Sequence, residues 1–565
     1  MIRYQISYDN PLSHFIKVKV CFRADGNESE LKLPAWRPGR YQIQNFAKNL
    51  KNLVARQNGS ELNCTKTSKD SWLVKHAPGE VCVTYEYYAF QMDAGSSWLD
   101  EEQLYLNFIN FALFLPEQMS VTHRVQLEVP DNYKVGTGLA EVAPYTFECD
   151  SFFELVDSPL MASPSLRQVS YRVDKCDFHI WIQGDLPQSD EALIADFEPF
   201  TRKQMAVMGG FPCPAYHFLV QSLPYRHYHG VEHLNSTMIT IGPGAELAER
   251  KLYKEFLGVS CHELFHTWNV IRIRPAEMSP YDFTGENYHE TGFVTEGVTT
   301  YYGDLFLARS GVFSQEEYLN EVNKLLKRHY NNEGRKHYSV AASSYDLWLD
   351  GYERGIPGRK VSIYNEGALA AMMLDLKIRL KHIHQRSLDD VMRLMWERHQ
   401  WKDGGYTYND YQQAAEEVYG EGLSSYFTQI ISGTQPYEEE LASLFEACGL
   451  SFEMTASEKT EERDYGIRLI SSKDRHVIDD IAFGCVAEKV LSRKDEVLQL
   501  NGQDFDGQWP EESEGGVQLL INRFGRSVEV ELVKGAGPFF SVYQVTVNKG
   551  ASTAQKNNLE RWLKA

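Results

Sequence analysis

The segment Ser260–Trp268 has the residue types of a metal-dependent catalytic site. It contains the pattern His262-Glu263-x-x-His266. Two histidines four positions apart lie on the same face of a helix, close enough together to bind one metal ion. In this pattern the metal is usually zinc, and the intervening glutamate is the base that takes a proton from the attacking water. The pattern predicts one zinc ion per chain, with His262 and His266 as ligands and Glu263 as the general base.

A helix is expected to carry these residues. Apolar periodicity predicts a helix from about residue 245 to residue 269, with Leu252, Phe256 and Val259 on one face. At about 100° per residue, Glu263 continues this face and the two histidines flank it. The site should therefore point toward the interior. The alternative is that both histidines are core residues hydrogen-bonded to the backbone.

A catalytic zinc site needs a third protein ligand and keeps its fourth position for water. A second helical run extends to Arg309 and ends before Gly311, and Glu296 lies in its first turn. Glu296 is therefore the predicted third ligand. A glutamate is also favoured at a helix start by the helix dipole alone, and this is the alternative interpretation.

Several segments of the chain resemble one family of enzymes. HELFHTWNVIRIRP and the following TEGVTTYYGDL resemble the glycyl aminopeptidase family of zinc metallopeptidases. LPAWRPGRY near the N-terminus, GVEHLNS before the metal helix, and SVAASSYDLWLDGY and VSIYNEGALAAMMLDLKIR after it are similar to further segments of that family. The resemblance implies a gluzincin with a thermolysin-like catalytic domain, a C-terminal PDZ domain and a preference for small N-terminal residues such as glycine or alanine.

The resemblance also implies a residue that stabilises the oxyanion. Aminopeptidase N-like gluzincins place a tyrosine in a Y-x-K-G segment, and Tyr364 begins the matching segment here. Glu366 stands where those enzymes have lysine, and Thr300 stands where thermolysin has an aspartate that supports the metal site. Tyr364 is predicted to donate a hydrogen bond to the developing oxyanion. The alternative is that it only packs, as most of the 32 tyrosines must.

Glu232 and Gly230 are predicted to bind substrate. In the aminopeptidase N-like enzymes a G-x-M-E-N segment on an edge strand holds the glutamate that binds the free amine, and Gly230-Val231-Glu232-His233 occupies the matching place. A buried carboxylate suits this role because its hydrogen bond to an ammonium group is strong where water is excluded. The alternative is a solvated glutamate at the end of a strand.

The patterns along the chain predict a multidomain α+β protein. Period-2 alternation predicts an N-terminal all-β domain over residues 1–165. The expected order continues with a thermolysin-like (gluzincin) zinc catalytic domain at 166–310 and a mostly helical part of the catalytic region at 311–454. By resemblance a PDZ-like domain covers 455–548, with its best marker at Asp495–Gly502, and a tail helix covers 549–565. Peptide binding by the PDZ-like domain is not expected, because its carboxylate-binding loop departs from the usual pattern.

Composition excludes several classes of partner. A net charge of −21 over 565 residues argues against nucleic acid and against an anionic membrane surface. No run of 18 apolar residues predicts a membrane span. The nine cysteines are scattered without C-x-x-C, which is typical of reduced thiols, and the start of the sequence lacks the pattern of a secretory signal. These features predict a cytoplasmic protein; the oligomeric state is not indicated.

The function expected from the sequence is zinc-dependent removal of N-terminal residues from peptides. One alternative is a metalloendopeptidase, with the same zinc site but no site for a free amine. The other is a non-catalytic scaffold, which the complete set of ligands and general base disfavours. Because all predicted catalytic residues precede the polar segment 455–464, removal of residues 455–565 is expected to leave the metal site intact.

Overall fold

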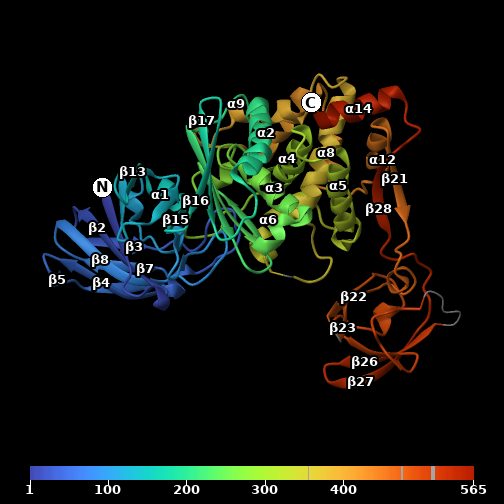
Figure 1. Cartoon of the computed structure of the whole chain (residues 1–565), viewed down its shortest axis with the longest axis horizontal. Helices are drawn as coiled ribbons and strands as arrows, with labels where there is room; N and C mark the ends of the chain where they lie inside the picture. The colour runs from blue at the N-terminus through green and yellow to red at the C-terminus, as the bar shows by residue number, and fades with distance from the viewer. Residues whose placement is uncertain (354, 473–474, 511–515, 565) are drawn as a thin grey trace.

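The computed structural model describes residues 1–353, 355–472, 475–510 and 516–564. Figure 1 shows a β-rich region at the N-terminal end, a central region of one sheet and many helices, and a smaller β-rich region near the C-terminal end. The expected multidomain organisation, with an N-terminal β-rich domain and a helical region after the metal helix, is confirmed. Residues 473–474 and 511–515 of the predicted C-terminal β domain, together with residues 354 and 565, lie outside the described residues.

The N-terminal region is built on an eight-stranded sheet with the order β13-β14-β11-β1-β2-β8-β4-β5. Alternate residues of β1, β8 and β11 are buried, because successive side chains of a strand point to opposite faces. The strands are β1 (Ile2–Ser7), β2 (Phe15–Ala24), β4 (Leu50–Gln57), β5 (Ser60–Glu61), β8 (Gly79–Tyr88), β11 (His123–Leu127), β13 (Ala140–Ala143) and β14 (Thr146–Cys149). Two smaller sheets comprise β3 (Glu28–Lys32), β6 (Cys64–Ser68) and β7 (Ser71–Lys75), and β9 (Trp98–Leu99), β10 (Leu104–Leu106), β12 (Lys134–Thr137) and β15 (Leu160–Ser163).

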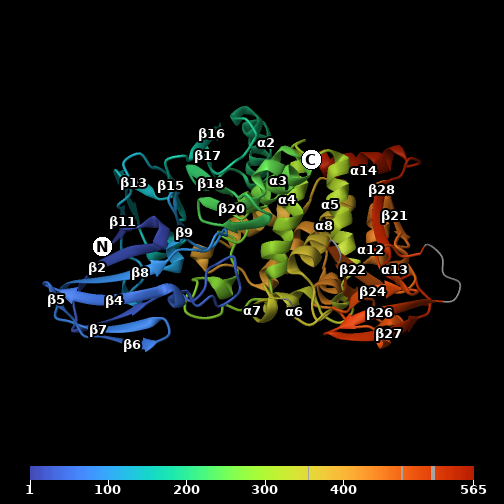
Figure 2. The ribbon, with the colours of Figure 1, turned by 60° about the horizontal axis from the view of Figure 1, so that its bottom comes forward.

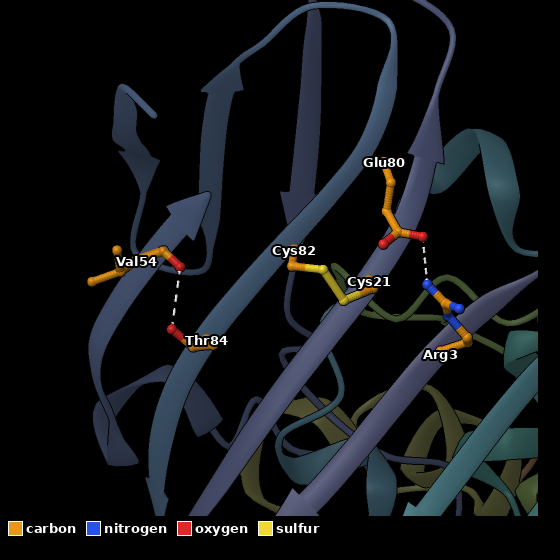
Figure 3. Close-up of a disulfide and its surroundings, with 6 residues drawn as sticks. All are labelled: Arg3, Cys21, Val54, Glu80, Cys82 and Thr84. Carbon is orange, nitrogen blue, oxygen red and sulfur yellow. Dashed lines mark hydrogen bonds and ion pairs between the residues drawn. A yellow bond between two sulfur atoms is a disulfide. The ribbon is translucent and has the colours of Figure 1, made fainter. Parts of the chain in front are cut away.

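The eight-stranded sheet contains a disulfide that the sequence analysis did not predict. Cys21 on β2 and Cys82 on β8 face each other across adjacent antiparallel strands and are bonded. Figure 3 shows the bond beside the ion pair of Arg3 with Glu80. The prediction of reduced thiols is therefore wrong for these two cysteines. Their spacing of 61 residues gave no motif, because only the strand register brings them together.

The central region begins with a mixed five-stranded sheet of order β16-β17-β18-β20-β19. Its strands are β16 (Arg167–Val173), β17 (Cys176–Gln183), β18 (Ala215–Ser222), β19 (His227–Glu232) and β20 (Ser236–Gly242). Helices α2 (Asp190–Met208) and α3 (Arg250–Phe265) pack against it. Strand β19 lies at the edge and runs antiparallel to β20, so one of its sides is free beside α3.

Helix α3 is shorter than predicted. A 3₁₀ segment (Gly244–Ala248) and the extended residue Glu249 precede it, and the α-helix ends at Phe265. The predicted apolar face of Leu252, Phe256 and Val259 is buried, as expected.

A helical body follows the metal helix. It contains α4 (Thr299–Arg309), α5 (Gln315–Tyr330), α6 (Val340–Tyr345), α7 (Leu347–Asp350), α8 (Ile363–Lys381), α9 (Leu388–Arg398), α10 (Tyr408–Tyr419), α11 (Ser424–Tyr426) and α12 (Glu438–Ala447). Helix α8 is buried over most of its length, so it forms the centre of this body. Among the described residues, we find no helix with the length and apolar character needed to cross a membrane.

The small C-terminal β-rich region has its own hydrophobic core, which includes Ile467, Ile478 and Leu519. Its elements are α13 (Thr460–Arg463), β22 (Ile467–Ser472), β23 (Arg475–Ile481), β24 (Glu496–Leu500), β25 (Gln503–Asp504), β26 (Val517–Arg523) and β27 (Arg526–Leu532). The strands follow the order β22-β23-β24-β26-β27, with β25 paired to β24. The expected polar linker is thus partly ordered, since α13 lies within it.

The chain enters and leaves this region through one pair of strands. β21 (Leu450–Thr455) and β28 (Val542–Val547) are antiparallel, with Thr455 opposite Val542. Both views place them side by side near α5 and α12 (Figures 1 and 2). The chain then ends in α14 (Thr553–Lys564), whose Trp562 is fully buried in the main hydrophobic core.

The packing of α14 against the core changes what is expected when residues 455–565 are removed. The indole N–H of Trp562 donates to the hydroxyl of Tyr301 at 2.8 Å, and Arg309 donates to the Trp562 carbonyl at 3.3 Å. Tyr301 and Arg309 lie on α4, the helix that follows the predicted ligand Glu296. Removal of residues 455–565 would therefore open the core of the central helical region, so the expectation that the predicted metal site stays intact does not follow from the fold.

Candidate active site

Three predicted metal ligands from two elements converge on one point. The Nε2 atoms of His262 and His266 are 2.9 Å apart. Oε2 of Glu296 lies 3.6 Å from Nε2 of His262 and 3.4 Å from Nε2 of His266. Tetrahedral zinc with bonds of about 2.0–2.1 Å needs ligand atoms roughly 3.3 Å apart, which is close to these separations. The donor set of two imidazoles and one carboxylate thus fits a tetrahedral metal ion with one open position.

Asn269 fixes one ligand and joins the two elements. Nδ1 of His266 lies 2.6 Å from the carbonyl of Asn269, so Nδ1–H donates and Nε2 keeps its lone pair for a metal. The side-chain amide of Asn269 donates to the Val294 carbonyl at 2.8 Å and to Oγ1 of Thr299 at 3.0 Å. These bonds hold the end of α3 against the segment that carries Glu296. These hydrogen bonds can orient the ligands in this chain, which has Thr300 at the position of the aspartate that supports the metal site in thermolysin.

Glu296 lies in a π-helix (Phe293–Val298) rather than in an ordinary α-helical turn. A π-helix places side chains differently from an α-helix and is frequent at functional sites. Burial opposes ionisation of Glu296, but the adjacent imidazoles outweigh it and lower the pKa of this carboxyl to about 2. Glu296 is therefore a carboxylate at neutral pH, the form that binds a metal.

Glu263 is buried beside the three ligands. One of its oxygens, Oε2, has no hydrogen-bond partner among the described residues. Burial raises the pKa of Glu263 well above its usual range, although nearby His266 opposes the shift. The other oxygen faces Gly230 on β19, where an added Cβ would lie 2.2 Å from Oε1. Gly230 therefore leaves space between the edge strand and Glu263.

Glu232 lies at the C-terminal end of β19, 6% exposed, and burial raises its pKa. A carboxylate oxygen of Glu232, one of Glu263 and a ring nitrogen of His266 all lie within 4.8 Å of one another. Gly39 of the N-terminal region covers the other side, where an added Cβ would lie 2.6 Å from Oε2 of Glu232. The solvated-glutamate alternative is thereby wrong for Glu232.

Tyr364 lies at the start of α8 and faces the metal ligands. Its ring stacks near that of His262, with centroids 6.5 Å apart, and it lines the same cleft. Tyr352 lies beside Tyr364, and its hydroxyl donates to the Gly39 carbonyl at 3.1 Å. Tyr364 is 36% exposed, so it is not simply a packed core residue.

Glu366 has a structural role outside this site. Its Oε2 pairs with Nδ1 of His329 on α5 at 2.6 Å, and both side chains are buried. The pair joins the start of α8 to α5. Glu366, which stands at the lysine position of the Y-x-K-G pattern, therefore has a buried partner in His329.

These residues line one cleft of about 570 Å³ between β19, α3, α4 and α5. All seven predicted site residues line it, namely Gly230, Glu232, His262, Glu263, His266, Glu296 and Tyr364. The sequence patterns gave no role to Asn269 or Tyr352, and they did not predict that Gly39 lies against Glu232. Asn269 is part of the HELFHTWN segment and Gly39 is part of LPAWRPGR, so both were within quoted motifs but had no assigned role.

Two segments of the chain match models of known protein families. Residues 3–164 match the family model of the peptidase M61 N-terminal domain, and residues 255–370 match that of the M61 glycyl aminopeptidase. The chain thus contains both domains of M61 peptidases and is a metallopeptidase. No curated protein matches the sequence.

Two solved structures show the fold. An aminopeptidase N family protein from Idiomarina loihiensis superposes with a TM-score of 0.92 over 100% of both chains, at 24% identity. An M1 zinc metallopeptidase from Deinococcus radiodurans has a TM-score of 0.50 and 14% identity, covering 77% of this chain and 94% of its own. The first likeness extends over the C-terminal β-rich region as well as the catalytic region.

Proposed function

We propose that the protein is a zinc-dependent aminopeptidase. The observation that carries the proposal is the place of Glu232. Its carboxylate is buried next to the general base Glu263, and Gly39 lies against its far side. A peptide can therefore present its terminal ammonium group to Glu232, but little space remains for residues that precede it.

The residues His262, His266 and Glu296 would hold the metal. A bound zinc ion would polarise the scissile carbonyl and lower the pKa of a coordinated water. The two-nitrogen, one-oxygen donor set supports zinc, which accepts imidazole and carboxylate together in tetrahedral sites. The M1 metallopeptidase from Deinococcus radiodurans is a zinc enzyme, which is in keeping with this proposal.

The other residues have separate roles in the proposed reaction. Glu263 accepts a proton from the attacking water and passes it to the leaving amine. The hydroxyl of Tyr364 donates to the oxygen that becomes negative in the transition state. Glu232 binds the substrate ammonium through a charge-assisted hydrogen bond. Gly230 leaves space for the substrate backbone to pass between β19 and Glu263.

The substrate is a peptide with a free N-terminus. We propose a small first residue, glycine or alanine, on the basis of the match to the M61 glycyl aminopeptidase model. For the C-terminal β-rich region we propose a PDZ-like fold, supported by its separate core and its strand order. The cytoplasmic location expected from the sequence has less support, since a disulfide such as Cys21–Cys82 is typical of oxidising compartments.

The test compares aminoacyl reporters, free peptides and N-acetylated peptides, each with and without a metal chelator. An aminopeptidase hydrolyses Gly or Ala reporters and free peptides, loses this activity with the chelator and regains it with zinc. Elemental analysis should find one zinc per chain in the active protein and none in a His262→Ala, His266→Ala double variant. Internal cleavage of N-acetylated peptides would support the metalloendopeptidase instead. Absence of bound metal after zinc loading would support the scaffold.

A further inference from the structure

The end of the cleft opposite Glu232 is lined by basic side chains from three elements. Arg226 precedes β19, Lys251 and Lys254 lie on α3, and Lys324 and Arg328 lie on α5. We call these five residues the basic rim. The rim stands out because the whole chain carries a net charge of −21. It lies within the same cleft as the proposed metal ligands, so a bound substrate can reach it.

Helix α3 connects the rim to the metal site. After its first residue, the positions of α3 that are not buried are Lys251, Lys254, Glu255, Gly258 and His262. Apart from the adjacent Lys254 and Glu255, successive positions are three or four residues apart, so they form one stripe along the cleft. Since an α-helix rises 1.5 Å per residue, Lys254 lies about 12 Å and Lys251 about 16 Å along the axis from His262.

Strand β19 gives the direction of the substrate. Glu232 lies at its C-terminal end, Gly230 faces Glu263, and Arg226 lies just before its first residue. A peptide whose ammonium group is bound to Glu232 and whose first carbonyl is beside His262 must therefore extend toward Arg226. At about 3.3 Å per extended residue, the terminal carboxylate of a peptide of four or five residues lies roughly 10–13 Å beyond that carbonyl. This length brings the carboxylate to the basic rim.

Acidic side chains neutralise only part of the rim. Glu255 pairs with Arg226 at 2.5 Å, and Glu321 lies 2.7 Å from Lys324 and 3.7 Å from Lys254. Asp304 also lines the cleft, and burial raises its pKa to about 7, so it is only partly ionised at neutral pH.

Lys251 and Arg328 are left with their charge available. Neither forms an ion pair with another described residue, and both are exposed. The rim therefore keeps a positive charge that is free to bind an anion.

We propose that the basic rim binds the C-terminal carboxylate of short peptides, with Lys251 and Arg328 as the main specificity-determining residues. This inference rests on the proposed aminopeptidase function. It identifies the preferred substrates as free peptides of about four or five residues, such as the products of an endopeptidase, rather than long chains. Charge-assisted hydrogen bonds from the rim would favour a carboxylate over a neutral amide.

The experiment compares Gly-Ala-Ala-Ala with its C-terminal amide and measures kcat/KM for each. The parent protein should prefer the free acid by about ten-fold, the effect of one charge-assisted hydrogen bond. In a Lys251→Gln, Arg328→Gln double variant this preference should fall to about two-fold or less. Lys327→Gln is the matched control, because Lys327 is an exposed cation of α5 that does not line the cleft. High salt should also reduce the preference of the parent, since exposed charges are screened.

Three outcomes would overturn the proposal. The first is a parent protein that cleaves the acid and the amide equally well. The second is a Lys327→Gln variant that loses the preference as much as the double variant does. In the third, the parent cleaves Gly-Ala-Ala-Glu amide as efficiently as the free acid Gly-Ala-Ala-Ala, and the double variant cleaves that amide poorly. The rim would then bind an acidic side chain rather than the terminal carboxylate. Failure of the proposed aminopeptidase function would give a different result, because the parent would then release no N-terminal glycine from either peptide.

Discussion

Gly39 of the N-terminal region lies against the carboxylate of Glu232 in the catalytic region, nearly two hundred residues later in the chain. Its backbone has φ of +74°, and an added Cβ would be 2.6 Å from Oε2 of Glu232. This contact closes the cleft at the end where the terminal ammonium group is proposed to bind. The N-terminal β domain therefore forms part of the site and is not only an attached module.

The Gly39→Ala substitution should impair substrate binding. The methyl group should displace Glu232, and the left-handed backbone adds strain. We expect kcat/KM for a free tripeptide to fall at least ten-fold, mainly through KM, while the metal content stays normal. Gly59→Ala is the matched control, because Gly59 has a similar φ of +82° and no atom lies within 4 Å of an added Cβ. Equal kinetics for the two variants would show that the contact has no role in catalysis.

Tyr364→Phe should lower kcat by about 100-fold with little change in KM, because the lost hydrogen bond forms mainly in the transition state. Tyr352→Phe removes the hydroxyl that donates to Gly39 beside Tyr364, so we expect a smaller loss of about three- to ten-fold. Steady-state kinetics on one aminoacyl reporter would measure both. Normal kcat in Tyr364→Phe would assign oxyanion stabilisation to another group.

Glu263→Gln should keep the metal and lose at least about 100-fold in kcat, because an amide cannot accept the proton of the attacking water. Elemental analysis and kinetics on the same sample separate loss of the base from loss of the ligand set. Glu246→Gln, an exposed glutamate ahead of α3 and outside the cleft, is the control. A metal-free Glu263→Gln protein would leave the role of this residue as a base unsupported.

Two deletions should behave differently. Replacing residues 457–540 by a two-residue turn joins β21 to β28 across the pair Thr455 and Val542, and it keeps Trp562 in the core. We expect this protein to fold and bind metal. A chain ending at residue 454 loses Trp562 and its bond to Tyr301, which should cost at least about 3–5 kcal/mol of unfolding free energy.

Thermal unfolding of both proteins, with metal content, measures this difference. Similar melting temperatures for the two deletions would contradict the structural role of α14. Failure of the internal deletion alone would show that the C-terminal β-rich region also stabilises the catalytic region.

Local patterns predicted the elements that carry the chemistry. The apolar periodicity of Leu252, Phe256 and Val259 predicted the buried face of α3, and all three side chains are buried. The spacing of His262, Glu263 and His266 likewise placed them together; Glu263 and His266 are buried, and His262 is partly exposed to the cleft. In each case the signal lies within a few turns of the chain.

Features that depend on distant contacts could not be predicted in this way. The π-helix at Glu296 has no distinct sequence pattern and is held by Asn269 from another element. The disulfide depends on strand register, and the docking of α14 depends on the buried contact of Trp562 with Tyr301. Resemblance to a family marked the segment that contains Gly39, but only the fold places that glycine against Glu232.

Glu232 is proposed to make the enzyme an aminopeptidase by binding the terminal amine, and the Glu232→Gln variant isolates this role. The measurement is kcat/KM for Gly-Ala-Ala and N-acetyl-Gly-Ala-Ala in the parent and in the variant, with metal content checked in both. We predict that the parent strongly prefers the free amine and that the variant loses at least about ten-fold on this substrate while keeping its metal. Equal cleavage of the free and acetylated peptides by the parent, or an unchanged preference in the variant, would show that Glu232 does not select the free amine.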